Sequence, residues 1–135
     1  MIQFYFLSVL LNALAGYILF TGEEGGALEF RSGFSLKDET FKFVVGILSV
    51  VTGLLKLLSP IEGDIPIIGD FIPGIMSFLA GFILIFEYYR TRSSLENSEN
   101  AEKIDRILIK NKKIAGIAAF AVAALHFLFP KVLLL

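Results

Sequence analysis

Two ionisable side chains interrupt the long apolar stretches of this chain, and they are the first places to look for chemistry. Lys56 lies near the end of the apolar run 43–58, and His126 lies near the end of the run 114–130. A charged group inside an apolar helix is costly, so it faces a protein interior, pairs with a partner or marks a pathway. We expect Lys56 to reach the outer interface and pair with an acidic residue, or to join a buried site. We expect His126 to form a hydrogen bond between helices.

The familiar patterns of enzymes and cofactor sites are missing from the rest of the sequence. It contains no cysteine, phosphate loop, zinc-binding histidine pair or Ser/His/Asp set, and a single histidine is a poor basis for a metal or haem site. No basic arm indicates nucleic-acid binding. We therefore predict a non-enzymatic protein without a cofactor or metal, and an intramembrane enzyme using His126 is the least favoured alternative.

Four apolar runs must position these residues. Hydrophobic residues make up 56% of the 135 residues, which is above the usual range for a globular domain. A bilayer accepts helices of roughly 20 apolar residues. The prediction is an all-α, integral membrane four-helix bundle in one domain. Its spans are about 1–21, 40–59, 70–89 and 112–133, with connections 22–39 and 90–111 and an outer turn 60–69.

The first run also has one property of a signal peptide, because Ala13-Leu14-Ala15 resembles a cleavage site. No Lys or Arg precedes this run, and it continues through Phe20. We therefore predict a retained helix.

The basic residues predict the orientation of the chain in the membrane. Of the 12 Lys and Arg residues, all but Lys56 and Lys131 belong to the connection between spans 1 and 2 or to the one between spans 3 and 4. The positive-inside rule places both connections in the cytoplasm. The termini and the outer turn then lie on the far side of a cytoplasmic membrane.

The connections hold several local signals. Residues 35–38 resemble a capping box that would start the second helix. Residues 28–36 fit either a small hairpin or an interfacial loop. Residues 102–110 place apolar side chains on one helical face, which predicts an extension of the fourth helix on its neighbours or on lipid headgroups, with a partner-docking helix as the alternative.

Each span has a narrow stripe of small or polar residues and a broad face of large apolar ones. Residues three, four and seven positions apart share a helix face, and small residues let membrane helices approach closely. We therefore expect the four stripes to meet inside one bundle. The predicted packing positions are Gly46, Ser49, Gly53, Gly74, Ser77, Gly81, Gly116, Ala119 and Ala123.

The polar members of these stripes fall at similar depths. Lys56 and His126 lie about 20 Å from the cytoplasmic ends of their helices, at roughly 1.5 Å per residue. The sequence therefore predicts a polar cluster in the outer half of the bundle. Its members are Ser8, Asn12, Lys56, Asp70 and His126.

The segment 63–74 repeats a Gly-Asp pattern followed by Pro. Proline and glycine favour tight bends, so the segment fits an ordered hairpin in which Asp70 caps the third span. The alternative is an outer vestibule that attracts cations through Glu62, Asp64 and Asp70.

Two functions fit these features. The first is a non-enzymatic accessory subunit or self-assembling module that acts by helix packing, with itself or another membrane protein as partner. The second is a homo-oligomeric channel or transporter for an ion or small solute, in which the polar cluster forms part of the route.

Overall fold

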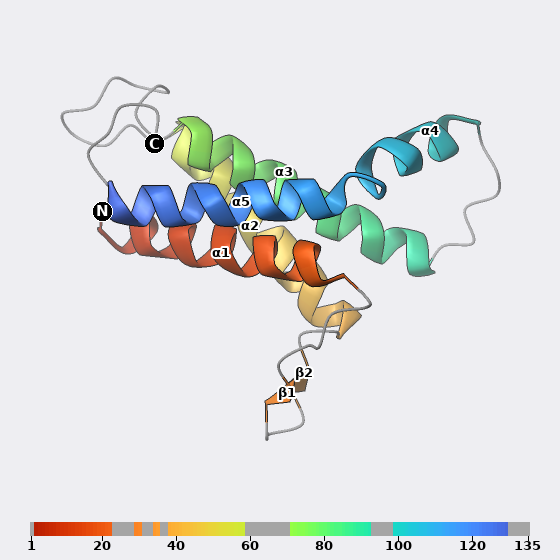
Figure 1. Cartoon of the computed structure of the whole chain (residues 1–135), viewed down its shortest axis with the longest axis horizontal. Helices are drawn as coiled ribbons and strands as arrows, with labels where there is room; N and C mark the ends of the chain where they lie inside the picture. The colour runs from red at the N-terminus through yellow and green to blue at the C-terminus, as the bar shows by residue number, and fades with distance from the viewer. Residues whose placement is uncertain are drawn as a thin grey trace.

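The computed structural model describes residues 2–22, 29–30, 34–35, 38–58, 71–92 and 99–129. The described chain is helical apart from one short hairpin (Figure 1). In order, its elements are α1 (Ile2–Thr21), β1 (Glu29–Phe30), β2 (Phe34–Ser35), α2 (Glu39–Leu58), α3 (Phe71–Arg92), α4 (Glu99–Leu108) and α5 (Lys112–Leu128).

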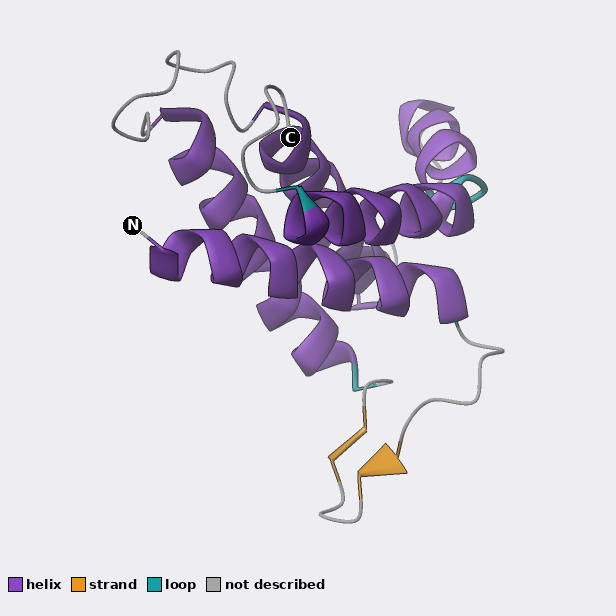
Figure 2. Cartoon of the chain, turned by 60° about the vertical axis from the view of Figure 1, so that its left-hand side comes forward, coloured by secondary structure: helices purple, strands orange, loops and turns teal. Residues whose placement is uncertain are grey.

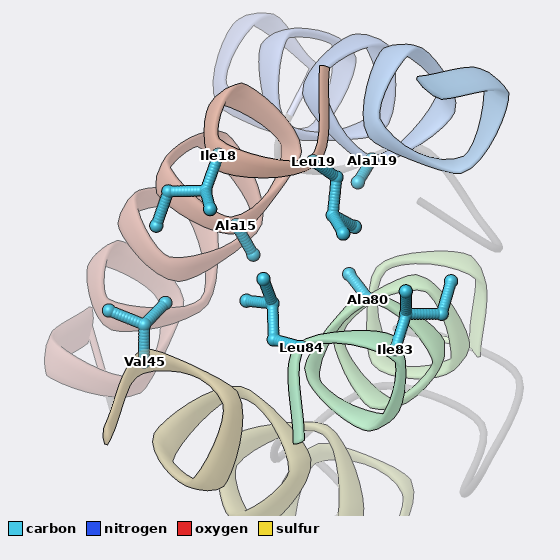
Figure 3. Close-up of a cluster of buried hydrophobic side chains, with 8 residues drawn as sticks. All are labelled: Ala15, Ile18, Leu19, Val45, Ala80, Ile83, Leu84 and Ala119. Atoms are coloured by element: carbon cyan, nitrogen blue, oxygen red, sulfur yellow. The ribbon is translucent and has the colours of Figure 1, made fainter. Parts of the chain in front are cut away.

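The four long helices pack side by side with alternating directions. α1 packs most closely on α5, and α2 packs most closely on α3. α1 also contacts α2 and α3, while α2 and α5 occupy opposite corners (Figure 3). The start of α1, the end of α2, the start of α3 and the end of α5 therefore gather at one end of the bundle, which we call the polar end (Figures 1 and 2). α4 projects from the other end, which we call the charged end.

Three of these helices are long and apolar enough to cross a membrane, over Gln3–Thr21, Glu39–Leu58 and Phe71–Arg92. α5 has 17 residues and extends roughly 26 Å, compared with a hydrocarbon core of about 30 Å. The predicted fourth span was to continue to residue 133, but α5 ends at Leu128. Phe129 precedes Pro130 and leaves the helical region with φ −128° and ψ 66°, because the proline ring disfavours helical backbone in the residue before it.

The start of α2 differs from the predicted capping box. Ser35 belongs to β2, and the helix begins at Glu39. The cap is Asp38, whose Oδ1 accepts a hydrogen bond of 2.9 Å from the backbone N–H of Thr40. A carboxylate at this position satisfies a free backbone donor and also interacts favourably with the positive end of the helix dipole.

The structure also defines parts of the two longer connections. β1 and β2 are antiparallel, with Glu29 opposite Ser35 and Phe30 opposite Phe34, so the first connection contains a hairpin. The predicted extension of the fourth helix is wrong, because α4 is a separate helix. Asn111 has φ −99° and ψ 6°, which interrupts the helical backbone between α4 and α5. Asparagine is unfavourable inside a helix, because its side-chain amide forms hydrogen bonds with nearby backbone groups in non-helical conformations.

The interior of the bundle has two different halves. Towards the charged end, apolar side chains from all four long helices meet in one cluster (Figure 3). Its members are Ala15, Ile18, Leu19, Val45, Ala80, Ile83, Leu84 and Ala119. Towards the polar end, polar side chains outnumber the buried Leu11, Pro73 and Ala123, and they are Ser8, Asn12, Ser49, Thr52, Lys56, Ser77 and His126.

The outward faces of the helices have the opposite character. Large apolar side chains such as Leu10, Leu48, Phe82 and Phe120 are exposed along all four long helices. Soluble monomers rarely expose contiguous apolar surface on this scale. The distribution is that of a protein whose surroundings are apolar.

Candidate functional site

The centre of the candidate site is a contact between Lys56 and His126. The Nζ atom of Lys56 lies 2.9 Å from Nε2 of His126. Lys56 is 8% exposed and His126 is 1% exposed. Because α2 and α5 occupy opposite corners of the bundle, the long lysine side chain crosses the interior to reach the imidazole.

The charge state of the lysine determines the hydrogen-bonding roles of the two nitrogens. A lysine ammonium has three donors and no acceptor. With Lys56 in that form, Nε2 of His126 accepts the hydrogen bond, and the proton of the neutral ring is on Nδ1. Lys56 and His126 both make further interactions beyond this pair.

Tyr5, on α1, contacts both the backbone and the ring of His126. Its hydroxyl donates hydrogen bonds to the backbone carbonyl of His126 at 2.8 Å and to that of Phe127 at 3.2 Å. Its ring centroid lies 4.8 Å from that of the imidazole. Tyr5 was not part of the predicted cluster, although its spacing from Ser8 and Asn12 puts it on the same helix face.

Asn12 and Ser8 are fully buried on α1. The Nδ2 atom of Asn12 donates a hydrogen bond of 3.1 Å to the carbonyl of Pro73 in the first turn of α3. Asn12 therefore ties α1 to the start of α3. Thr52 is a buried polar residue that the predicted cluster also omitted, and its spacing of four residues from Lys56 was the available signal.

Several polar oxygens in this half of the bundle have no hydrogen-bond partner within the part of the chain that the structure describes. They are Ser8 Oγ, Asn12 Oδ1, Ser49 Oγ and Ser77 Oγ. A buried polar group without a partner costs about 1–3 kcal/mol. Burying these oxygens therefore costs folding free energy that helix packing alone would not require.

The acidic residues of the two predicted sites belong to a part of the chain that the structure does not describe. Asp70 of the predicted cluster and all three residues of the predicted vestibule, Glu62, Asp64 and Asp70, lie outside the described residues. Among the described residues, no group of three or more His, Cys, Asp or Glu side chains could hold a metal ion.

The predicted packing glycines lie where helix backbones touch. A Cβ atom built on Gly81 would be 2.5 Å from the carbonyl oxygen of Gly46, and one on Gly53 would be 2.7 Å from that of Gly74. α1 and α5 repeat this contact, since a Cβ on Gly116 would be 2.7 Å from the carbonyl oxygen of Gly16. The other predicted packing positions are buried as well, namely Ser49, Ser77, Ala119 and Ala123.

An apolar groove of about 380 Å³ lies along α1 and α5, away from the polar cluster. It is lined by Gly16, Tyr17, Phe20, Ile117, Phe120 and Ala121. None of these residues belongs to the predicted polar cluster.

Comparisons with known proteins give the chain a family. A protein-family model matches residues 1–126. An uncharacterized protein of Treponema pallidum (strain Nichols) is 31% identical over 135 residues, which cover 100% of both chains. No solved structure matches. The chain therefore belongs to the family that this model defines, and it is a relative of the uncharacterized Treponema pallidum protein.

Proposed function

We propose that this protein is a four-span module of the cytoplasmic membrane that acts by helix packing, as a non-enzymatic accessory subunit or a self-assembling unit. The observation that carries this proposal is the backbone contact at glycine in both helix pairs, Gly46 with Gly81 and Gly16 with Gly116. Membrane helices gain little from turning large apolar residues inward, so they associate through such close approaches. The large apolar side chains on the outward faces of the helices also support a location in the membrane.

The fourth span is part of this proposal. α5 is near the lower limit of length for a span, but it packs along α1, which is itself long and apolar enough to cross a membrane. Its outward residues Ile117, Phe120 and Leu125 are large, apolar and exposed. A helix with this surface, paired with a membrane helix, belongs in the same bilayer.

Energy transfer between labelled copies tests self-assembly. The chain has no cysteine, so Lys110→Cys provides a unique labelling position for donor and acceptor dyes. Transfer that persists as the proteoliposomes are diluted with lipid would support a self-assembling unit. If energy transfer disappears on dilution, the protein does not self-assemble. The accessory-subunit form of the proposal then requires that it purify with another membrane protein in a fixed ratio. A monomer that purifies without one from native membranes would overturn the proposal.

A second candidate is favoured by the contact between Lys56 and His126. A buried lysine is costly in a membrane helix, and intramembrane ionisable groups often mark the route of an ion or solute. In this candidate, copies of the chain form a channel or transporter, and the polar half of the interior contributes part of the route.

Flux into proteoliposomes separates the two candidates. Transport predicts a proton, cation or anion flux above that of empty vesicles, with Lys56→Met and His126→Leu each reducing it. Ion fluxes equal to those of empty vesicles for the wild-type protein would remove the ion-conducting form of this candidate. They would leave the packing proposal unaffected.

A further inference from the structure

α4 presents an apolar face that no other described part of the bundle covers. Ile104 is 44% exposed and Ile107 is 64% exposed, and these two residues lie one turn apart on the same side of the helix. Leu108, by contrast, packs against the apolar core cluster. α4 lies at the charged end, beyond the start of α5 and next to the end of α3 (Figure 1), and its exposed Ile104 and Ile107 lie outside the four-helix bundle.

Specific contacts hold α4 in this position. The guanidinium Nη1 of Arg90, in the last turn of α3, lies 2.7 Å from Oδ1 of Asp105. Leu108 adds its apolar contact with the bundle. Nearby, Nζ of Lys112 at the start of α5 lies 2.9 Å from Oε1 of Glu87 on α3. These contacts fix the orientation of α4 relative to the charged end of the bundle.

The charges around this face are positive in sum, with three acids balancing three bases over residues 99–110 and the excess supplied by the neighbouring ends of α3 and α5. Residues 87–92 and 99–113 together hold seven Lys and Arg residues against four Asp and Glu residues, an excess of three positive charges. Two of the four acids, Glu87 and Asp105, are already paired with basic residues. Arg106 and Lys110 are exposed. The surface near Ile107 is thus both apolar and basic.

Aromatic side chains indicate the depth of this surface relative to the membrane boundary. Phe43 stacks on Tyr88 with ring centroids 4.3 Å apart, and the guanidinium of Arg92 lies 5.1 Å from the centroid of the Tyr88 ring. Tyr89 is exposed beside them. Tyrosine rings are enriched at the boundary between hydrocarbon and headgroups. Since Arg90 joins this turn of α3 to α4, the helix lies close to the same boundary.

We propose that α4 is an interfacial helix that docks on the anionic phospholipid headgroups of the adjacent leaflet. Ile104 and Ile107 enter the boundary region, and Lys103, Arg106 and Lys110 face the phosphates, which is the pattern of amphipathic helices that lie on membranes. This inference rests on the four-span bundle proposed above. The occupant of the apolar face is lipid, and a second protein is the competing outcome.

A single tryptophan reports the surroundings of α4, because the chain contains none. The probe variant is Ile107→Trp, and the matched control is Glu102→Trp, on the opposite side of the same helix. A third variant, Phe120→Trp, reports on the outward face of α5. Each full-length variant is reconstituted into phosphatidylcholine vesicles with or without phosphatidylglycerol. Quenching by brominated lipid and by aqueous iodide is then measured.

We expect brominated lipid to quench the Ile107→Trp variant and iodide to quench the Glu102→Trp variant, with phosphatidylglycerol strengthening the difference. Replacing Lys103, Arg106 and Lys110 together by Gln should lower the ratio of docked to undocked helix on the order of a hundredfold, since each basic residue near an anionic surface contributes to binding. Added salt should act in the same direction.

Three other results would overturn the inference, each in a distinguishable way. Equal iodide quenching of the Ile107→Trp and Glu102→Trp variants would show that α4 stays in water. Protection of the Ile107→Trp variant from both quenchers would show that a protein covers the face. Failure of deeply brominated lipid to quench the Phe120→Trp variant would reject the four-span bundle itself.

Discussion

Lys56 and His126 meet in the bundle interior from opposite corners, and the cost of burying them bears on their role. Removing a lysine from water is expensive unless hydrogen bonds compensate for the lost hydration. The imidazole provides one acceptor, and Tyr5 fixes the backbone that carries it. The pair therefore positions α5 relative to α2 at the polar end, whether or not it also serves a solute.

The first prediction concerns the coupling of this pair. His126→Leu removes the acceptor 2.9 Å from Lys56, and we expect it to lower the free energy of unfolding by about 1–3 kcal/mol. His126→Gln, which keeps an acceptor, should cost less. The double variant Lys56→Met/His126→Leu should recover much of the loss. Unfolding in mixed detergent micelles, followed by circular dichroism, measures all of these proteins, and strictly additive effects would disprove the coupling.

The second prediction concerns the buried hydroxyls. Ser8 and Ser77 are fully buried, and neither Oγ has a hydrogen-bond partner among the described residues. Replacing either by Ala removes a polar atom that gains nothing from the fold, so stability should stay the same or rise by up to about 1 kcal/mol. The same unfolding assay measures it. A marked loss of stability would mean that the hydroxyls have partners in the membrane.

At the scale of helices, close backbone contact defines the two tight pairs. Gly46 and Gly53 lie seven residues apart on α2, as Gly74 and Gly81 do on α3. In antiparallel packing, the first glycine of one helix therefore meets the last of the other. Because two helical turns separate the contacts, both fall on the same face and the backbones approach at both.

The third prediction compares two of these glycines on one helix. A Cβ on Gly81 would meet the backbone oxygen of Gly46 at 2.5 Å, whereas a Cβ on Gly74 would meet the flexible side chain of Leu57 at 3.1 Å. Backbone cannot move aside without separating the helices. Gly81→Ala should therefore destabilise by about 1–3 kcal/mol, while Gly74→Ala should have a much smaller effect. Thermal unfolding in detergent distinguishes them, and equal losses would contradict the packing shown here.

At the scale of the whole molecule, the alternating helices separate two kinds of chemistry. The charged end holds the ion pairs of α3 with α4 and α5 and is joined to the apolar half of the core. The polar end holds the contact between Lys56 and His126. With the charged end in the cytoplasm, as the basic residues predict, the polar cluster faces the outer leaflet.

The fourth prediction concerns this orientation. Gln3→Cys and Lys110→Cys lie at opposite ends of the bundle, and both positions are exposed. In intact spheroplasts, a membrane-impermeant thiol reagent should label the first, and it should label the second only after permeabilisation. A reporter fused at Leu135 should be active on the outer side. A cytoplasmic signal from that fusion would overturn the predicted topology and the depths derived from it.

The sequence alone determined the helical class, the approximate limits of the three helices long and apolar enough to cross a membrane, and the small-residue faces of the helices. Apolar periodicity and the spacing of glycines are local properties, so they can be read without a structure. Ser8, Asn12, Lys56 and His126 could be grouped by phase and depth alone. Tyr5 shares the helix face of Ser8 and Asn12 but was left out of that group, and its contact with the His126 backbone depends on how α1 meets α5.

The tertiary structure decided which helices pair and which side chains touch. Helix periodicity says which face of α2 turns inward, but not that Lys56 crosses to α5 instead of remaining at the outer interface. The position of α4 against the bundle likewise depends on tertiary contacts, since Arg90 pairs with Asp105 and Leu108 packs on the core. Contacts between residues distant in sequence depend on the mutual packing of all the helices, which no local pattern records.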